Sequence, residues 1–377
     1  GVLHYGQGKW YPGEALPRWQ KACYWRPDGV PVWRDPALLA APEVDLGHDR
    51  DTAQRFARAL VAMLSLPEGA LLPAFEDALY HLWLEQGTPT NVELSAVDLA
   101  DPAARRELAR RLDGDLGAPA GFVLPLEHSP LADRWQTSPW PLRRDRLVLL
   151  PGDSPLGLRL PLDALPWEDP EARPVPEQGP DPLAPTAPLA AAHPAGARAG
   201  GTASRPRFSG AMVEDGRVVH TALAVEARGG VLHVFLPPLS TLEAWLELVA
   251  AVEAIAAEQR VPLVLEGYDP PRDTRLSKFA VTPDPGVIEV NVHPVASFRE
   301  LVGQTETLYE LARRCRLGTE KFMLDGRHTG TGGGNHVTLG GPTPADSPLL
   351  RRPALLRSLI TYWQNHPALS YLFSGLF

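Results

Sequence analysis

The chain has 377 residues, a formal net charge of −9 at pH 7, and 44% hydrophobic and 21% charged residues. This composition is ordinary for a soluble globular protein, the negative charge gives a nucleic-acid partner no electrostatic support, and no apolar run reaches the ~18–20 residues of a membrane-spanning helix. Two cysteines, Cys23 and Cys315, are too few for a disulfide framework, so we expect a reducing cytoplasm as the location.

Residues 1–166 combine an aromatic-rich segment with predicted helices and short strands. The segment 1–47, rich in aromatic residues, Gly and Pro, either wraps around the main body or forms a wall of a substrate cleft. Periodic apolar residues predict helices, and apolar runs predict strands. The predicted helices cover 51–65 with Asp51 as N-cap, 75–86, and a stretch that starts at 101; the predicted strands cover 122–126, 147–150 and 158–162.

A pair of arginines, Arg143 and Arg144, lies close to Trp135 and Trp140 in the sequence. Such a pair can bind a phosphate or a carboxylate through two hydrogen bonds. Arginines that pack on aromatic rings at the surface are the alternative interpretation.

A low-complexity segment, residues 167–206, divides the chain. Pro, Ala and Gly dominate it and large apolar side chains are almost absent, so it cannot bury enough surface to offset the entropy of ordering it. We therefore expect a disordered linker or insertion between residues 1–166 and the region 207–377.

Hairpins and helices alternate in residues 207–377. Gly229 and Gly230 predict a hairpin of strands 221–228 and 231–236, in which Glu226 faces His233. Two Ser-x-x-Glu capping boxes predict helices, and further strands and a last helix complete the region. The capping boxes start at Ser240 and Ser297, the strands cover 261–265, 278–282 and 287–293, and the last helix starts at Arg352. The fold class is α+β, an antiparallel sheet backed by helices on one face.

Carboxylates on these strands suggest a metal site. Residues 287–293 alternate, so Glu289, Asn291 and His293 share one face of a strand. Together with Glu226, Glu266 and His336, Glu289 would supply ligands that suit Mg²⁺ or Mn²⁺. The alternatives are a surface Glu226–His233 pair and a structural role for His293.

A glycine-rich loop follows at 330–336. Its glycines allow close approach of the backbone to a phosphate, and its N–H groups can form an anion nest. The loop lacks the Lys-Ser/Thr of a P-loop, so by itself it is a weak signal.

Three stretches resemble one known family, the bacterial amidoligase family DUF2126. They are LHYGQGKWYPGE at 3–14, VTPDPGVIEVNVHP at 281–294 and GTEKFMLDGRHTGTGGGNH at 318–336. The resemblance covers nearly the whole chain apart from 167–206. It implies a glutamine-synthetase-like ligase core, in which ATP and divalent metals activate a carboxylate as an acyl phosphate that an amine then attacks.

The resemblance also implies roles for individual residues. Metal would be held by Glu226, Glu266, Glu289 and His336; catalysis would involve Glu289, Asn291 and Arg327; nucleotide or phosphate would contact Gly332, Gly333, Gly334, Lys278, Arg143 and Arg144. Asn291 stands where related ligases often have a second acidic residue, which leaves the number of metal ions open.

The leading hypothesis is therefore an ATP- and Mg²⁺-dependent carboxylate–amine ligase whose substrates include peptides or proteins. One alternative is a non-catalytic peptide- or nucleotide-binding module that works with a transglutaminase-like domain, and another is a metal-dependent amide hydrolase. Because the chain starts at Gly1 and ends on apolar residues, we expect it to be part of a longer protein that carries such a transglutaminase-like domain.

Overall fold

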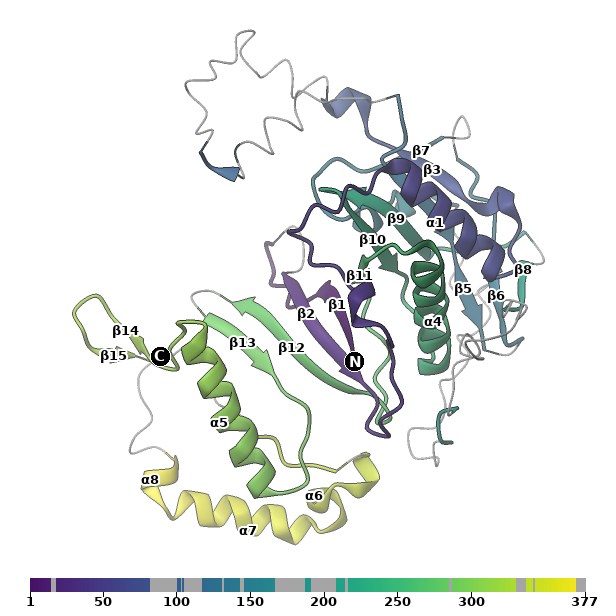
Figure 1. Cartoon of the computed structure of the whole chain (residues 1–377). Coiled ribbons are helices and arrows are strands. Elements are labelled where there is room, and N and C mark those ends of the chain that lie inside the picture. Colours follow the sequence, from purple (N-terminus) through teal and green to yellow (C-terminus); the bar gives the residue numbers. More distant parts are fainter. Residues whose placement is uncertain are drawn as a thin grey trace.

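A mixed, mostly antiparallel sheet forms the centre of the computed structural model (Figure 1). Its strand order in the described residues is β13-β12-β2-β1-β11-β10-β9-β4-β3-β7. The structure describes residues 1–14, 18–81, 100–102, 104, 117–130, 132–142, 146–166, 187–190, 208–213, 216–284, 287–329, 337–341 and 343–370.

The strands come from both sides of the predicted linker. In sheet order they are β13 Val287–Asn291, β12 Ser277–Asp284, β2 Trp19–Trp25, β1 Val2–Gln7, β11 Leu263–Gly267, β10 Val231–Leu236, β9 Ala222–Arg228, β4 Gly121–Pro125, β3 Leu72–Phe75 and β7 Leu147–Val148. Two smaller sheets consist of β5 Glu127–Ser129, β6 Arg134–Thr137 and β8 Gly210–Met212, and of β14 Lys321–Phe322 and β15 His328–Thr329. Residues 1–166 and 207–377 thus build one sheet together.

Three strand pairs of the large sheet run parallel, which corrects the expectation of an antiparallel sheet. They are β1–β11, β10–β11 and β3–β7. Helix α4 (Leu242–Gln259) connects β10 to β11, and a helical crossover of this kind returns the chain to the end of the sheet from which it started. The predicted β9–β10 hairpin is confirmed, with Glu226 opposite His233.

Helices α1 (Arg50–Met63) and α4 pack on one face of the sheet, which we call the helix face (Figure 1). Leu60 and Trp245 are fully buried between these helices and the strands. The N-cap of α1 is Asp49, whose carboxylate accepts a hydrogen bond from Thr52 N at 2.9 Å, so the prediction of Asp51 was wrong by two residues. Similarly, Thr241 caps α4 in place of Ser240.

The opposite face, which we call the cavity face, is covered in part by residues 156–165. The prediction of a strand at 158–162 was wrong, because this stretch forms two short 3₁₀ turns, Leu156–Leu158 and Leu162–Ala164. Their leucines pack with Phe235 and Ala224 in a second, smaller core. Residue 75, expected to start a helix, ends β3, and helical backbone is found at residues 78–81.

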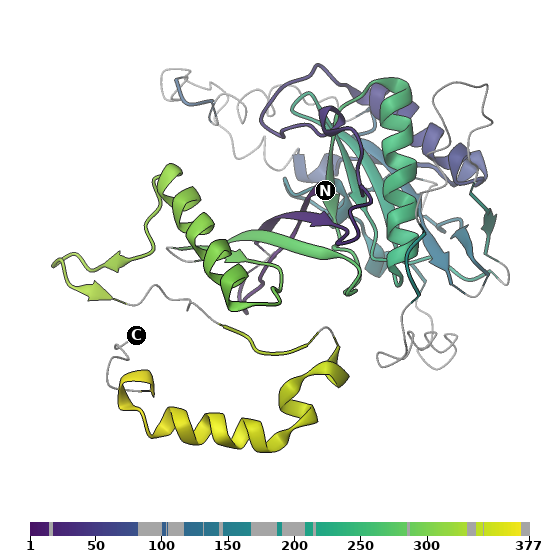
Figure 2. The same ribbon diagram turned by 60° about the horizontal axis from the view of Figure 1, so that its bottom comes forward.

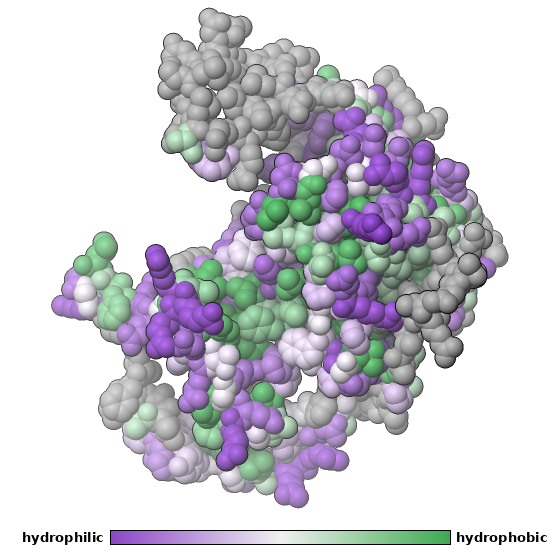
Figure 3. Space-filling view, in the orientation of Figure 1, coloured by the Kyte–Doolittle hydropathy of each residue, from purple (hydrophilic) through white to green (hydrophobic). Residues whose placement is uncertain are grey.

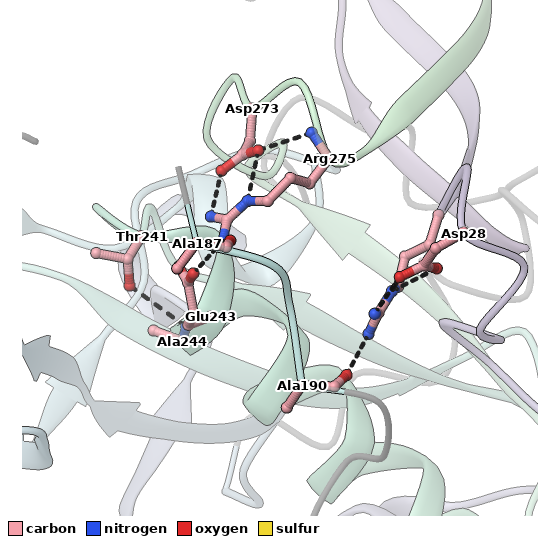
Figure 4. Close-up of polar contacts among 9 residues, drawn as sticks. Asp28, Ala187, Ala190, Thr241, Glu243, Ala244, Asp273 and Arg275 are labelled. Atoms are coloured by element: carbon pink, nitrogen blue, oxygen red, sulfur yellow. Dashed lines mark hydrogen bonds and ion pairs between the residues drawn. The ribbon is translucent and has the colours of Figure 1, made fainter. Parts of the chain in front are cut away.

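Four residues of the predicted linker, 187–190, are held against the body of the protein (Figure 4). Arg275 donates to the carbonyl of Ala187 at 2.9 Å, and Arg26 donates to the carbonyl of Ala190 at 3.0 Å. Leu189, between them, packs against the large core. The other residues of 167–206 lie outside the described part.

Helix α5 (Phe298–Arg314) follows β13 and lies beside it (Figure 2). Its predicted capping box is confirmed, because Ser297 Oγ accepts from Glu300 N at 3.3 Å. The remaining helices form an arm, coloured yellow, on the far side of α5 from the sheet. They are α6 Pro348–Arg351, α7 Pro353–Gln364 and α8 Pro367–Ser370. In the space-filling view, hydrophobic residues gather over the β12–β13 hairpin beside α5 (Figure 3).

Candidate active site

Polar side chains concentrate where the parallel strands β1, β11 and β10 end. These strands finish at Gln7, Gly267 and Leu236, and we call their common border the carboxyl edge. Ligands of open α/β sheets often bind just outside the carboxyl ends of parallel strands. The loops that leave this edge carry Lys9 after β1 and Asp269 after β11.

On the cavity face, a buried carboxylate cluster comprises Glu226, Arg228, His233 and Glu266. The guanidinium of Arg228 lies 2.6 Å from Glu226 and 2.7 Å from Glu266. His233 Nδ1 lies 3.1 Å from Glu266 Oε2, and the backbone N–H of Leu156 donates to Glu226 at 2.9 Å. The side chains of Glu266 and His233 are 6% and 3% exposed, so this is an interior ion network.

Burial and charge act in opposite directions on the two glutamates. Burial raises the pKa of Glu226, and the neighbouring Glu266 carboxylate adds to this effect while Arg228 opposes it. Burial alone would also raise the pKa of Glu266, but the hydrogen bond to His233 and the charge of Arg228 outweigh it and lower that pKa. Glu266 is therefore the carboxylate that stays ionised more readily.

A cavity of about 200 Å³ adjoins this cluster at the carboxyl edge. Its lining includes Tyr5, Gln7, Trp19, Phe235 and Glu266. Tyr5 pairs with Glu266 across β1 and β11, so the tyrosine ring and the carboxylate project from the same face. Gly267 closes one end with a φ of +111°, and a Cβ there would lie 2.5 Å from Leu236 O, so only glycine fits.

On the helix face, Asp269 gathers a second polar group, the Asp269 cluster. Lys278 Nζ lies 2.6 Å from Asp269 Oδ2, and Gln20 donates to the same carboxylate at 3.0 Å. His4 Nδ1 lies 3.6 Å from Asp269 Oδ1. Burial alone would raise the pKa of Asp269, but the Lys278 ammonium outweighs burial and lowers it.

His4 is fully buried, and neither of its ring nitrogens has a hydrogen-bond partner among the described residues. Burial lowers the pKa of His4 to about 4. His4 is therefore neutral at pH 7.

A third group, the strand-end cluster, joins the loop after β1 to the β12–β13 hairpin. It comprises Lys9, Glu14, Arg18, Asp284 and Glu289. Lys9 Nζ contacts the Glu289 carboxylate and lies 3.7 Å from Asp284, and the hydrogen bond to Glu289 raises the pKa of Lys9. Arg18 bridges Glu14 and Asp284, each at 2.5 Å. Asn291 Nδ2 donates to Glu289 at 3.3 Å.

The register of the sheet separates Glu289 from Glu226 and Glu266. Asn291, Ala280, Ala22 and His4 form one cross-strand row on the helix face, and Glu289 shares that face because it lies two residues from Asn291. Glu266 pairs with Tyr5 on the cavity face. With four strand steps of ~4.8 Å between β13 and β11, the two carboxylates are also ~19 Å apart along the sheet. The expectation that one ion binds all three carboxylates is therefore wrong.

The other predicted residues fall into two groups. Lys278 lies on the helix face in the Asp269 cluster, and Arg327, in the turn before β15, is exposed with Asp325 at 3.5 Å. The rest lie outside the described residues: Arg143, Arg144, Gly332, Gly333, Gly334 and His336.

Sequence reasoning missed Lys9, Asp269, Asp284 and Arg228. The pairing of Arg228 with Glu226 had a local signal, since residues two apart on a strand share a face. Lys9 had none, because its partner Glu289 is 280 positions away.

The carboxylates of the strand-end cluster agree in kind with a magnesium site. Glu289 and Asp284 surround one ammonium group, and the Asn291 amide is adjacent; oxygen donors of this type suit Mg²⁺. Across the described ranges, however, three or more acidic, His or Cys side chains do not converge on one point. In these ranges no helix is long and apolar enough to cross a membrane.

Comparison with known proteins identifies the family. Neither curated proteins nor solved structures yield a match to the chain. A family model described as "Putative amidoligase enzyme (DUF2126)" matches residues 1–377, the whole chain. By this match over its full length, the chain belongs to the DUF2126 family of amidoligase enzymes.

Proposed function

We propose that this protein is an ATP- and Mg²⁺-dependent carboxylate–amine ligase with a glutamine-synthetase-like core, and that its chemistry takes place at the carboxyl edge beside the strand-end cluster. The observation that carries the proposal is the position of Lys9. Its ammonium group lies next to Glu289 and Asp284, at the end of strands that belong to an amidoligase-family chain.

In the proposed reaction, a carboxylate oxygen of the first substrate attacks the γ-phosphorus of ATP, and the bond from that phosphorus to the β–γ bridging oxygen breaks to release ADP. The amine nitrogen then attacks the acyl carbon, phosphate leaves with the C–O bonding electrons, and a proton passes from nitrogen to the phosphate or to water. Phosphoryl transfer of this type depends on positioning and on neutralisation of charge.

The residues of the strand-end cluster have complementary roles in this proposal. Glu289 and Asp284 would hold Mg²⁺, which neutralises phosphate charge when bound. Lys9, exposed on a mobile side chain of four methylenes, would exchange its carboxylate partner for a phosphate oxygen. Asn291 orients Glu289 through its amide.

The test is ADP release from the protein with ATP, Mg²⁺ and a panel of carboxylates and amines. Lys9→Met should lower the rate about 100-fold, because removal of one preorganised donor to developing charge typically costs 10²–10³. Lys321→Met is the matched control, since Lys321 is also exposed but lies in β14, and it should keep the wild-type rate. Unchanged ADP release in both Lys9→Met and Glu289→Gln would rule out this site.

A non-catalytic nucleotide-binding module is the second candidate. It is favoured by one observation, that in the described part the strand-end cluster supplies only carboxylates already paired with Lys9 and Arg18. Tight binding of ATP and Mg²⁺ without ADP release for any substrate pair would select this candidate. Amide cleavage in the absence of ATP would instead indicate a hydrolase.

A further inference from the structure

The cavity at the carboxyl edge has the size of a small-molecule subsite. Its volume of about 200 Å³ is below the ~300–1,000 Å³ of pockets for drug-sized ligands. It is therefore too small for a nucleotide but large enough for a ligand of a few heavy atoms.

The wall of the cavity that Glu266 forms is negatively charged. Two carboxylates, Glu226 and Glu266, face one guanidinium, that of Arg228. Glu266 Oε2 contacts Arg228 at 2.7 Å and His233 at 3.1 Å, whereas Oε1 has a single long contact, 3.4 Å from Arg228. A carboxylate oxygen accepts two hydrogen bonds, so Glu266 retains capacity for another donor.

Aromatic rings form much of the remaining wall. Tyr5, Trp19 and Phe235 line the cavity, and the faces of such rings attract cations. Tyr5 already shows this behaviour, since Lys21 Nζ lies 5.1 Å from the centroid of its ring. Aromatic walls beside a carboxylate favour an amine cation and disfavour a carboxylate or a phosphate.

The cavity also adjoins the strand-end cluster. Gln7 and Trp19, which line it, pair across β1 and β2. At the next position Gly8 N donates to Arg18 O at 2.5 Å, and Lys9 follows directly. A ligand in the cavity therefore lies within a few residues of the group to which we assign phosphate binding.

We propose that this cavity binds the amine substrate in its ammonium form, with Glu266 as the acceptor and Trp19 as an aromatic wall. The assignment of this amine as a substrate rests on the proposed ligase function. The binding of an ammonium ion by the cavity does not, because it follows from the cavity itself.

The experiment is calorimetric titration of the protein with n-butylammonium, 1-butanol and butyrate, which share a chain length and differ in charge. Trp19→Ala and Trp10→Ala form a matched pair, because these tryptophans are 54% and 57% exposed and only Trp19 lines the cavity. We expect one n-butylammonium to bind and Trp19→Ala to weaken binding about fivefold. Trp10→Ala should stay within about twofold of the wild type.

The charge comparison is the second part. The neutral and anionic probes should bind at least about tenfold more weakly than n-butylammonium, and Glu266→Gln, where it folds, should remove this preference. Equal binding of 1-butanol or butyrate, an unchanged affinity in Trp19→Ala, or no binding of n-butylammonium up to tens of millimolar would each overturn the proposal.

The titration needs neither ATP nor Mg²⁺, so it separates two failures. Ammonium binding without ADP release for any substrate would keep the amine site and remove the ligase function. ADP release with no ammonium binding would do the reverse.

Discussion

The guanidinium of Arg228 lies 2.7 Å from the carboxylate of Glu266 beside the cavity, and the same group reaches Glu226 at 2.6 Å. One cation thus compensates two carboxylates whose side chains are 6% and 14% exposed. A buried carboxylate without a partner is costly, so the integrity of this part of the sheet depends on Arg228.

Arg228→Leu should lower the free energy of unfolding by about 2–3 kcal/mol, somewhat below the ~3–5 kcal/mol for a fully buried pair because Arg228 is partly exposed. Urea unfolding at pH 7 measures the change. Arg313→Leu, which breaks an exposed pair with Glu310 on α5, should cost less than ~1 kcal/mol. Similar losses in both variants would show that Arg228 does not compensate buried charge.

Gly6→Ala should destabilise the protein by about 1–3 kcal/mol through overpacking. A Cβ at Gly6 would lie 2.7 Å from Asp269 Oδ1 and 3.3 Å from the His4 ring, so the Asp269 cluster must move. Gly303→Ala is the control, because no atom lies within 4 Å of its added Cβ on helix α5; it should stabilise by up to ~1 kcal/mol. Thermal unfolding of both variants decides, and a neutral Gly6→Ala would contradict the close packing.

His4 should make stability depend on pH. Its folded-state pKa of about 4 lies below its ordinary value of 6.5, so the unfolded chain binds the extra proton between these values. The stabilisation is complete above pH 6.5 and is lost as the pH falls toward 4, up to about 3 kcal/mol.

His4→Leu should remove this contribution. The check is the difference in unfolding free energy between wild type and variant across pH 4 to 7, since other titrating groups are common to both. A difference that does not change with pH would show that His4 is protonated equally in the folded and unfolded states.

Removal of divalent ions should abolish ADP release in the proposed ligase, and Mg²⁺ or Mn²⁺ should restore it. Glu289→Gln should raise the Mg²⁺ concentration for half-maximal rate about tenfold, because an amide is a weaker ligand than a carboxylate. Glu320→Gln, an exposed glutamate outside the cluster, should leave this concentration unchanged. A wild-type Mg²⁺ dependence in Glu289→Gln would exclude that residue as a ligand.

Local patterns in the sequence were sufficient for features that neighbouring residues determine. The Gly229-Gly230 turn placed Glu226 opposite His233, and Ser297 with Glu300 set the start of α5, as the structure confirms. Each depends on hydrogen bonds and backbone angles within a few residues. The family resemblance of the motifs is likewise confirmed by the match over residues 1–377.

Only the tertiary structure decided which of these residues share a site. Glu266 and Glu289 each lie on a correctly predicted strand or strand end, yet they project from opposite faces, because β12, β2 and β1 lie between β13 and β11. The order of strands follows from pairings such as that of Tyr5 with Glu266, which burial of the whole sheet selects and no local period encodes. The same long-range packing brings Lys9 to Glu289 and Trp19 to the wall of the cavity.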